Sequence, residues 1–481
     1  MEIDYKKIGV KSGLEIHQQL DSHKLFCNCP SVLRSDDPEY EVSRRLHAVA
    51  GESGVIDSAV LHEAKQNKEF VYQAYDTTCL VELDEEPPHS INLEALKIAV
   101  QIALHLNCKI IPIAQVMRKT VLDGSNTGGF QRTVMIAIDG YIESSFGKVS
   151  ISNVFLEEDS ARPVSRDSKK AVYRLDRLGV PLVEIVTGPD IKCPEHAKEV
   201  ALKIGNILRS CKVRRGIGTI RQDLNISISG SNRVEIKGFQ DTKIMIKAVD
   251  NEILRQKKIL DDGAKNSCEV RNCLKDGTTE FLRPMPGSAR MYPETDVPLL
   301  RISRDFINEA KKDLPRLKSD IEADLKKQGL NEEMIKILFK QNRLEDYKEL
   351  YEILAKPMVL AKIMFMLPKE VAKKFDKTSL SVFKILNMDV LRLAVSGLVE
   401  GKITESYVKN FFEKVVGGEN PEDAIKFEKK DEGEVEERVM KIIKEKPGLN
   451  ANAYMGLVMK EFRGQIDGKG AMQLINKFVK K

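Results

Sequence analysis

Apolar and polar residues alternate along several short stretches of this chain, which is the pattern of β-strands with one packed face and one polar face. The first is GLEIHQQL at residues 13–20, where Leu14 and Ile16 would share one face and Glu15 and His17 the other. Further strand candidates are VMIAID, KVSISNVFL, GTIRQDLNISI and RVEIKGF. Because these stretches come in hairpin-like pairs, they favour antiparallel pairing over a parallel βαβ arrangement.

Two longer stretches repeat apolar residues at helical spacing. Residues 91–107 follow the stop-and-cap signal EEPPHS, and residues 194–210 begin at a proline. The first three hundred residues therefore predict an α+β fold built on a large mixed antiparallel sheet. After Pro298 the chain is charged and reads as helical, with few strand signals.

A glycine-rich break, VVGGENPED, and an acidic run, EKKDEGEVEE, indicate a linker near residue 416. We therefore predict three parts: a sheet-based domain at residues 1–301, a helical domain at 302–415, and a linker with a small helical tail at 416–481.

Composition narrows the class of protein. The 481 residues carry 77 Lys and Arg against 72 Asp and Glu, an excess too small to indicate nucleic-acid binding by itself. Tryptophan is absent and aromatic residues make up 6%, which argues against a base-stacking platform. No apolar run reaches the length of a membrane span, and the first residues lack the apolar core of a signal peptide. We expect a cytoplasmic protein with no membrane contact.

The eight cysteines contain no repeated CxxC pair, so the sequence does not spell a zinc ribbon. LFCNCP places Cys27 close to Cys29, and Cys79 could supply a third ligand. Reduced thiols are the expectation, and zinc is not.

The hairpin at residues 219–239 is the most informative stretch. A three-residue connection at 230–232 would place Glu235 opposite Ser227 and diagonal to Asn225, with Asp223 one step further along. A solvated sheet face is the alternative. The acidic run FLEEDSAR adds carboxylates at the end of an apolar strand, at Glu157, Glu158 and Asp159. Carboxylates with one imidazole suit Mg²⁺ or Mn²⁺ better than zinc.

Two loops have the composition of phosphate-binding segments. The glycine-rich stretch at 117–133 would expose backbone N–H groups, although it is not a Walker motif, and a surface turn is the alternative. Its polar and basic candidates are Arg118, Lys119, Ser125, Asn126 and Arg132. The proline-rich stretch at 283–298 excludes a central strand. There Arg283 and Arg290 could contact phosphate and Glu294 and Asp296 a metal, with a linker role as the alternative.

Taken together, these motifs resemble the GatB/GatE family of tRNA-dependent amidotransferase subunits. The motifs that carry the resemblance are GLEIHQQL, LFCNCP, TTCLVELDEEPPH, DGSNTGGFQRT, LEEDSA, YRLDRLGVPLVEIVTGPD, GTIRQDLNIS, VEIKGFQD and RPMPGSARMYPETD. LVMKEFRGQIDGK at 457–469 is similar to the family's YqeY-type tail, so the resemblance covers nearly the whole chain. The wording of the motifs favours the archaeal GatE type over GatB.

The resemblance implies an activity. Such proteins bind Glu-tRNA(Gln), phosphorylate the γ-carboxylate of its glutamate with ATP, and amidate it with ammonia from a partner, which for GatE is the asparaginase-like GatD. Activity on Asp-tRNA(Asn) as well, a non-catalytic tRNA-binding role, or a metal-dependent phosphodiesterase are the alternatives.

The resemblance also implies which residues act. It assigns catalysis and Mg²⁺ binding to Glu15, His17, Glu158 (with Glu157 as the alternative), Asp223 and Glu235. Lys460, Arg463 and Lys469 are candidates for tRNA contact, with surface solubility as the alternative. One departure stands out. The family's GatE members carry an inserted domain similar to one in bacterial-type aspartyl-tRNA synthetase, whereas here only residues 265–282 occupy that place.

Overall fold

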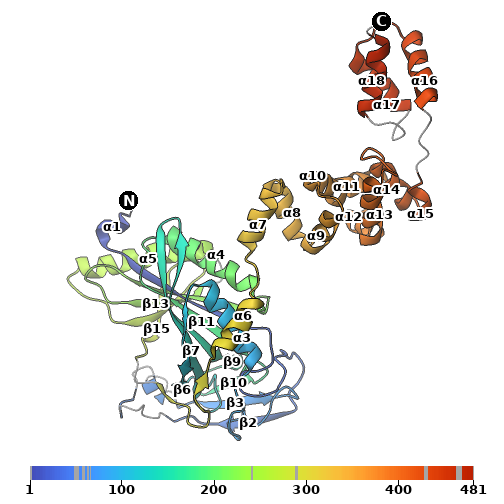
Figure 1. Ribbon diagram of the computed structural model, residues 1–481. Helices are drawn as coiled ribbons and strands as arrows, with labels where there is room; N and C mark the ends of the chain where they lie inside the picture. The colour runs from blue at the N-terminus through green and yellow to red at the C-terminus, as the bar shows by residue number, and fades with distance from the viewer. Residues whose placement is uncertain are drawn as a thin grey trace. The chain divides into compact units, whose positions relative to one another are not determined.

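The computed structural model describes residues 3–47, 54–56, 60–61, 64–65, 67–239, 242–287, 291–426, 432–461 and 468–479. The chain divides into two compact units, Met1–Lys318 and Ser319–Lys481. The first unit is built on sheets and the second on helices (Figure 1), which confirms the predicted α+β class. The three-part division into 1–301, 302–415 and 416–481 stays a prediction.

A large mixed sheet forms the centre of the first unit. Its strands lie in the order β15 (Thr279–Pro284), β14 (Glu269–Cys273), β13 (Val234–Phe239), β12 (Ile220–Ser227), β1 (Lys11–Gln19), β11 (Pro181–Thr187), β8 (Gly147–Glu158), β7 (Phe130–Ser144), β6 (Val116–Thr120) and β16 (Met291–Pro293), with β4 (Lys109–Ile110) also paired to β7. The proline-rich stretch at 283–298 supplies the end of β15 and all of β16, the two outermost strands, which fits the lack of an N–H that a central strand would need.

Helices cover one face of this sheet. The apolar residues of the alternating strands point to that face and pack against the helices. Leu14 and Ile16 are fully buried and join one apolar cluster with α3 (Leu93–His105), α4 (Pro194–Ser210) and α5 (Thr242–Asp261). Figure 1 shows α4 and α5 lying across the strands. Asn92 caps α3 by accepting from the backbone N–H of Ala95, two residues after the stop-and-cap signal EEPPHS ends. The short helices α1 (Tyr5–Ile8) and α6 (Arg304–Lys312) also belong to this unit.

The polar face of the sheet borders a cleft of about 1430 Å³. Its lining includes Glu15 and His17 of β1 together with Phe70 and Ala171, which belong to a second sheet. That four-stranded sheet has the order β2 (Tyr40–Arg44), β3 (Glu69–Ala74), β10 (Lys170–Arg174) and β9 (Arg162–Arg166). A further pair joins β17 (Leu300–Arg301) to β5 (Ile113–Ala114). The polar residues Glu15 and His17 of the alternating strand β1 therefore face the cleft.

The predicted register of the β12–β13 hairpin is wrong by two residues. Glu235 pairs with Asn225 and not with Ser227. The connection is longer than three residues: the Ser231 N–H closes a turn on the Ile228 carbonyl, and Ser231 and Asn232 then hydrogen-bond to Asn266 before β13 begins at Val234. An irregularity between Gln222 and Leu224 then shifts the pairing further along. The new register brings Glu235 closer to the acidic residues of β12 and β1.

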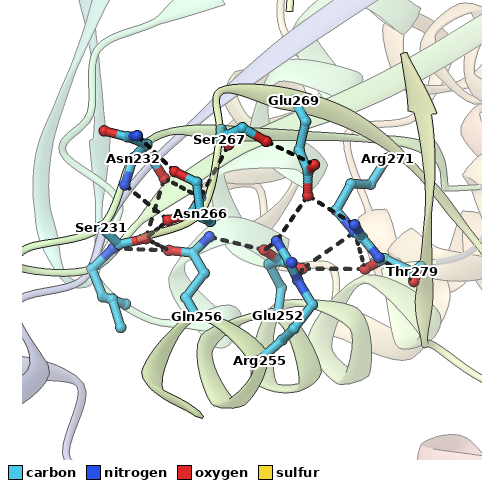
Figure 2. A network of polar contacts seen from close by, with 11 residues as sticks. Ser231, Asn232, Glu252, Arg255, Gln256, Asn266, Ser267, Glu269, Arg271 and Thr279 are labelled. Atoms are coloured by element: carbon cyan, nitrogen blue, oxygen red, sulfur yellow. Dashed lines mark hydrogen bonds and ion pairs between the residues drawn. The ribbon is translucent and has the colours of Figure 1, made fainter. Parts of the chain in front are cut away.

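A buried polar network ties the β14–β15 hairpin to α5 (Figure 2). Glu252 of α5 is fully buried and accepts hydrogen bonds from Arg255, Gln256 and Thr279, with Arg271 3.8 Å away. Arg271 in turn bonds Glu269 of its own strand and Thr279 of β15. Residues of the segment 265–282 are thus held against α5 by charged and polar groups.

Replacing Glu252 with alanine should destabilise the chain by about 3 kcal/mol, because the half-buried Arg255 and the buried Gln256 lose the carboxylate that accepts their hydrogen bonds. The shift should appear in the urea-unfolding midpoint followed by circular dichroism. Asp261→Ala is the matched control, since Asp261 lies exposed on the same helix, and it should change stability by no more than about 0.5 kcal/mol. Equal midpoints for the two variants would show that the network contributes little.

The second unit consists of helices around two apolar clusters. The first cluster lies among α7 (Lys318–Lys327), α8 (Glu332–Lys340), α9 (Leu344–Ile353), α10 (Pro357–Ala361), the π-helical turn η2 (Lys362–Met366), α11 (Leu367–Lys374), α12 (Ser379–Ile385), α13 (Met388–Val399), α14 (Val408–Val416) and α15 (Pro421–Ala424). The second lies among α16 (Glu432–Glu445), α17 (Ala451–Glu461) and α18 (Gly468–Val479). Among the described residues, no helix combines the length and apolarity needed to cross a membrane.

Candidate active site

Three carboxylates from neighbouring strands meet on the polar face of the large sheet. Glu15 of β1 pairs directly with Asp223 of β12, and Glu235 comes from β13, the next strand. Each offers an oxygen within 4.8 Å of the others. Asn225 donates to Glu15 over 2.8 Å and helps to orient it. Burial, and then the charges of Glu235 and Glu184, raise the pKa of Glu15 above its ordinary value.

A second group lies beside the first on the same face. His17 of β1, Glu184 of β11 and Glu157 of β8 also offer ligand atoms within 4.8 Å of one another. The His17 Nε2 atom lies 3.7 Å from Glu184 Oε2, and this contact outweighs burial and raises the pKa of His17. Thr133 and Gln131 of β7 donate to the carboxylate of Glu157. The two groups share β1, since Glu15 and His17 stand two residues apart on one strand face.

Lysines neutralise both groups. Lys119 of β6 lies 2.6 Å from Glu157 and 3.5 Å from Glu184, and Lys237 of β13 lies 2.5 Å from both Asp223 and Glu235. Burial raises the pKa of Glu157, whereas Lys119 and His17 hold the pKa of Glu184 below its ordinary value despite burial. The donors are carboxylate oxygens with a single imidazole, a set that fits Mg²⁺ or Mn²⁺.

Glu158 is not brought into either group. Glu157 lines the cleft and its neighbour does not, because successive strand residues point to opposite faces. Glu158 instead accepts from the backbone and the guanidinium of Arg132, which also bonds the fully buried Glu294. Between these two neighbouring glutamates, the geometry therefore favours Glu157, the alternative, over Glu158.

The glycine-rich loop turns its polar side chains inward. Ser125 is buried and donates to Asp123, and the buried Asn126 accepts from Ser160. Arg118 and Arg132 are held by Glu294 at 2.7 to 2.9 Å. None of these four candidates lines the large cleft, so their placement does not support phosphate binding there; Lys119 does line it.

The proline-rich stretch divides in the same way. Arg283 lines the cleft, whereas Glu294 serves the two arginines as their carboxylate and Asp296 is exposed beside Arg118. Arg290 lies outside the described residues.

The candidates for tRNA contact fall in the second unit. Lys460 is exposed on α17, while Arg463 and the side chain of Lys469 lie outside the described residues.

Two residues of the site were not singled out from the sequence. Glu184 lies in the apolar run VPLVEIV. A single carboxylate within such a run could have indicated a functional residue. Lys237 follows Glu235 by two residues and shares its face. A basic residue two positions from an acidic one is common on solvent-exposed sheet faces. The sequence therefore does not mark Lys237 as a functional residue.

The cysteines form a separate group away from the strand carboxylates. Cys27, Cys29, Cys79 and Glu82 offer ligand atoms within 4.8 Å of one another. Cys27 donates to Glu82, whose carboxylate also lies 3.1 Å from Lys24. The polar contact with Cys27 lowers the pKa of Cys79 to about 7. Three thiols with one carboxylate are a donor set that fits zinc, although the spacing along the sequence does not predict it.

Comparison with known proteins matches residues 10–308 to the GatB/GatE catalytic domain. The chain is also 35% identical to the GatE protein of Methanocaldococcus jannaschii, which belongs to its glutamyl-tRNA(Gln) amidotransferase, with both chains covered completely. The chain belongs to the GatB/GatE family. The resemblance drawn from its motifs is thereby confirmed.

Other relatives agree with this membership. The GatE protein of Archaeoglobus fulgidus is 33% identical over 99% of both chains, and that of Methanothermobacter thermautotrophicus is 34% identical over 85% of this chain and 86% of its own. The alignment with the Methanocaldococcus relative spans 638 positions against the 481 residues here. This family member therefore lacks segments that its full-length relative carries. The matched catalytic domain contains both carboxylate groups.

Proposed function

We propose that this chain is the GatE-type component that activates the glutamate of Glu-tRNA(Gln) with ATP and amidates it to give Gln-tRNA(Gln). The observation that carries the proposal is the pair of ligand groups side by side on one cleft of the catalytic domain. Phosphoryl transfer needs positioning and cations more than covalent help from the protein. Side chains on adjacent strands of one sheet provide such positioning.

Each group has a distinct part in the proposal. Glu15, Asp223 and Glu235 would hold one divalent cation, and His17, Glu157 and Glu184 a second. Mg²⁺ bound there, or Mn²⁺, would neutralise the charge that spreads over the transferred phosphoryl oxygens. The cleft, at about 1430 Å³, exceeds the usual range for one small ligand and has room for a nucleotide and an aminoacyl end together.

The partners follow from the same proposal. A GatD-like asparaginase would supply the ammonia, and tRNA(Gln) would be bound by the helical second unit and its YqeY-like tail. Exposed Lys460 supports a role in phosphate contact. Lys469 and Arg463 remain candidates by resemblance. Amidation of Asp-tRNA(Asn) in addition to Glu-tRNA(Gln) is the alternative substrate range.

The test is conversion of Glu-tRNA(Gln) by the purified chain with ATP, Mg²⁺ and free ammonium. We expect Gln-tRNA(Gln) to form only when all three are present, since ammonium replaces the partner's product. A phosphodiesterase on the same carboxylates would instead hydrolyse its substrate without ATP. A non-catalytic binder would retain tRNA but yield no product even with GatD added, and that result would overturn the proposal.

A further inference from the structure

The two ligand groups share one unusual feature: each already contains a lysine ammonium at the place where a cation would bind. Lys237 Nζ lies 2.5 Å from Asp223 Oδ2 and 2.5 Å from Glu235 Oε1. Lys119 Nζ lies 2.6 Å from Glu157 Oε1 and 3.5 Å from Glu184 Oε2. In both groups the ammonium contacts two of the three residues that offer ligand atoms.

Burial makes these ammonium groups necessary. Asp223, Glu235 and Glu184 are each no more than 8% exposed, and Glu157 is 1% exposed. Carboxylates held together away from water are costly unless a positive charge compensates them. A divalent cation can compensate them equally well, but it would bind the same carboxylates that the lysines now contact. Cation and lysine therefore compete for the same carboxylates.

The ammonium groups of both lysines have space in the cleft into which they can move. Both line the cleft, and their side chains are 30% and 14% exposed for Lys237 and Lys119. A lysine carries a compact point charge on a flexible stem, so its ammonium can leave one acceptor for another without moving the strand. Phosphate oxygens in the cleft would be such acceptors.

We propose that Lys237 and Lys119 are exchangeable counter-ions: they neutralise the two carboxylate groups in the cation-free chain, and release them when divalent cations bind, turning their ammonium groups to nucleotide phosphate. This inference rests on the proposed function. It makes cation binding and nucleotide binding mutually supportive, because the lysine displaced by one ligand is received by the other.

The experiment is to measure Mn²⁺ affinity and nucleotide affinity separately in Lys237→Met. Isothermal titration without nucleotide should show Mn²⁺ binding at least about tenfold tighter than in wild type, because the competing charge is gone. The affinity for ATP in saturating Mg²⁺ should fall about tenfold, because the phosphate contact is lost. A merely structural lysine would weaken both ligands together. Lys11→Met, at an exposed lysine outside the cleft, should change neither.

If Lys237→Met does not fold, Lys237→Gln and Lys119→Met serve as the test variants. Circular dichroism checks that each variant is folded. Unchanged or weaker Mn²⁺ binding in a folded variant would overturn the exchange while leaving the proposed function intact. Absence of Mn²⁺ binding by wild type would overturn the cation sites of the proposed function, and the exchange with them.

Discussion

Replacing Glu157 with glutamine should lower ATP-dependent conversion of Glu-tRNA(Gln) by about a hundredfold to a thousandfold. Glu157 is a buried carboxylate of the second ligand group, and glutamine keeps its shape while removing the charge that would hold a cation. Losing a group that stabilises transition-state charge typically costs two to three orders of magnitude. Single-turnover conversion with saturating ammonium measures the effect directly.

Glu158→Gln is the matched control, one residue further along the same strand. Glu158 faces away from the cleft, and a glutamine oxygen can still accept from the backbone N–H of Arg132. We expect conversion within about tenfold of wild type, in contrast to the Glu157 variant. If instead Glu158→Gln were inactive and Glu157→Gln active, the assignment of the two faces would be reversed and the second ligand group abandoned.

The contrast shows where reading the sequence succeeds and where it fails. The alternation in GLEIHQQL correctly places Leu14 and Ile16 on one face of the strand and Glu15 and His17 on the other. Only one orientation of the strand buries both apolar residues. The run Glu157, Glu158, Asp159 closes its strand with three acids, so polarity alone gives no phase there. Only the pairing with β11 and β7 decides which of them faces the cleft.

The hairpin register was predicted wrongly, and the candidates of the glycine-rich loop lie outside the cleft, for related reasons. The β12–β13 register depends on a connection that Asn266 holds from outside the hairpin, and a local pattern carries no information on such a partner. The glycine-rich loop has the composition of an anion cradle, but Thr127 donates to the backbone carbonyl of Glu82 and Ser125 donates to Asp123. Tertiary contacts decide whether a polar loop binds a ligand or packs. Cys79 and Glu82 likewise join Cys27 only through folding.

Asp159 organises the edge of the cleft, and its removal should destabilise the fold. It is 1% exposed, accepts from Gln19 of β1 over 2.7 Å and from Arg221 of β12 over 2.9 Å, and lies 3.8 Å from Arg177. It thus connects the end of β8 to the strands that carry both ligand groups. Asp159→Asn should cost about 2 kcal/mol at pH 7, because the half-buried Arg177 and Arg221 lose their counter-ion.

The pH dependence of that cost gives its signature. Burial alone would raise the pKa of Asp159, but the charges of Arg221 and Arg177 outweigh it and hold the pKa below its ordinary value. A carboxylate whose pKa is lower in the folded state stabilises the fold above its unfolded pKa of about 3.9, and this stabilisation is lost as the pH falls through the folded value. The difference in urea-unfolding midpoint between wild type and Asp159→Asn should therefore be constant from pH 7 to about pH 5 and shrink below about pH 4. Asp139→Asn, at an exposed residue of β7 with φ of 53°, should show no difference at any pH. A gap for Asp159→Asn that persisted unchanged into acid would mean that shape, and not charge, is what this position contributes.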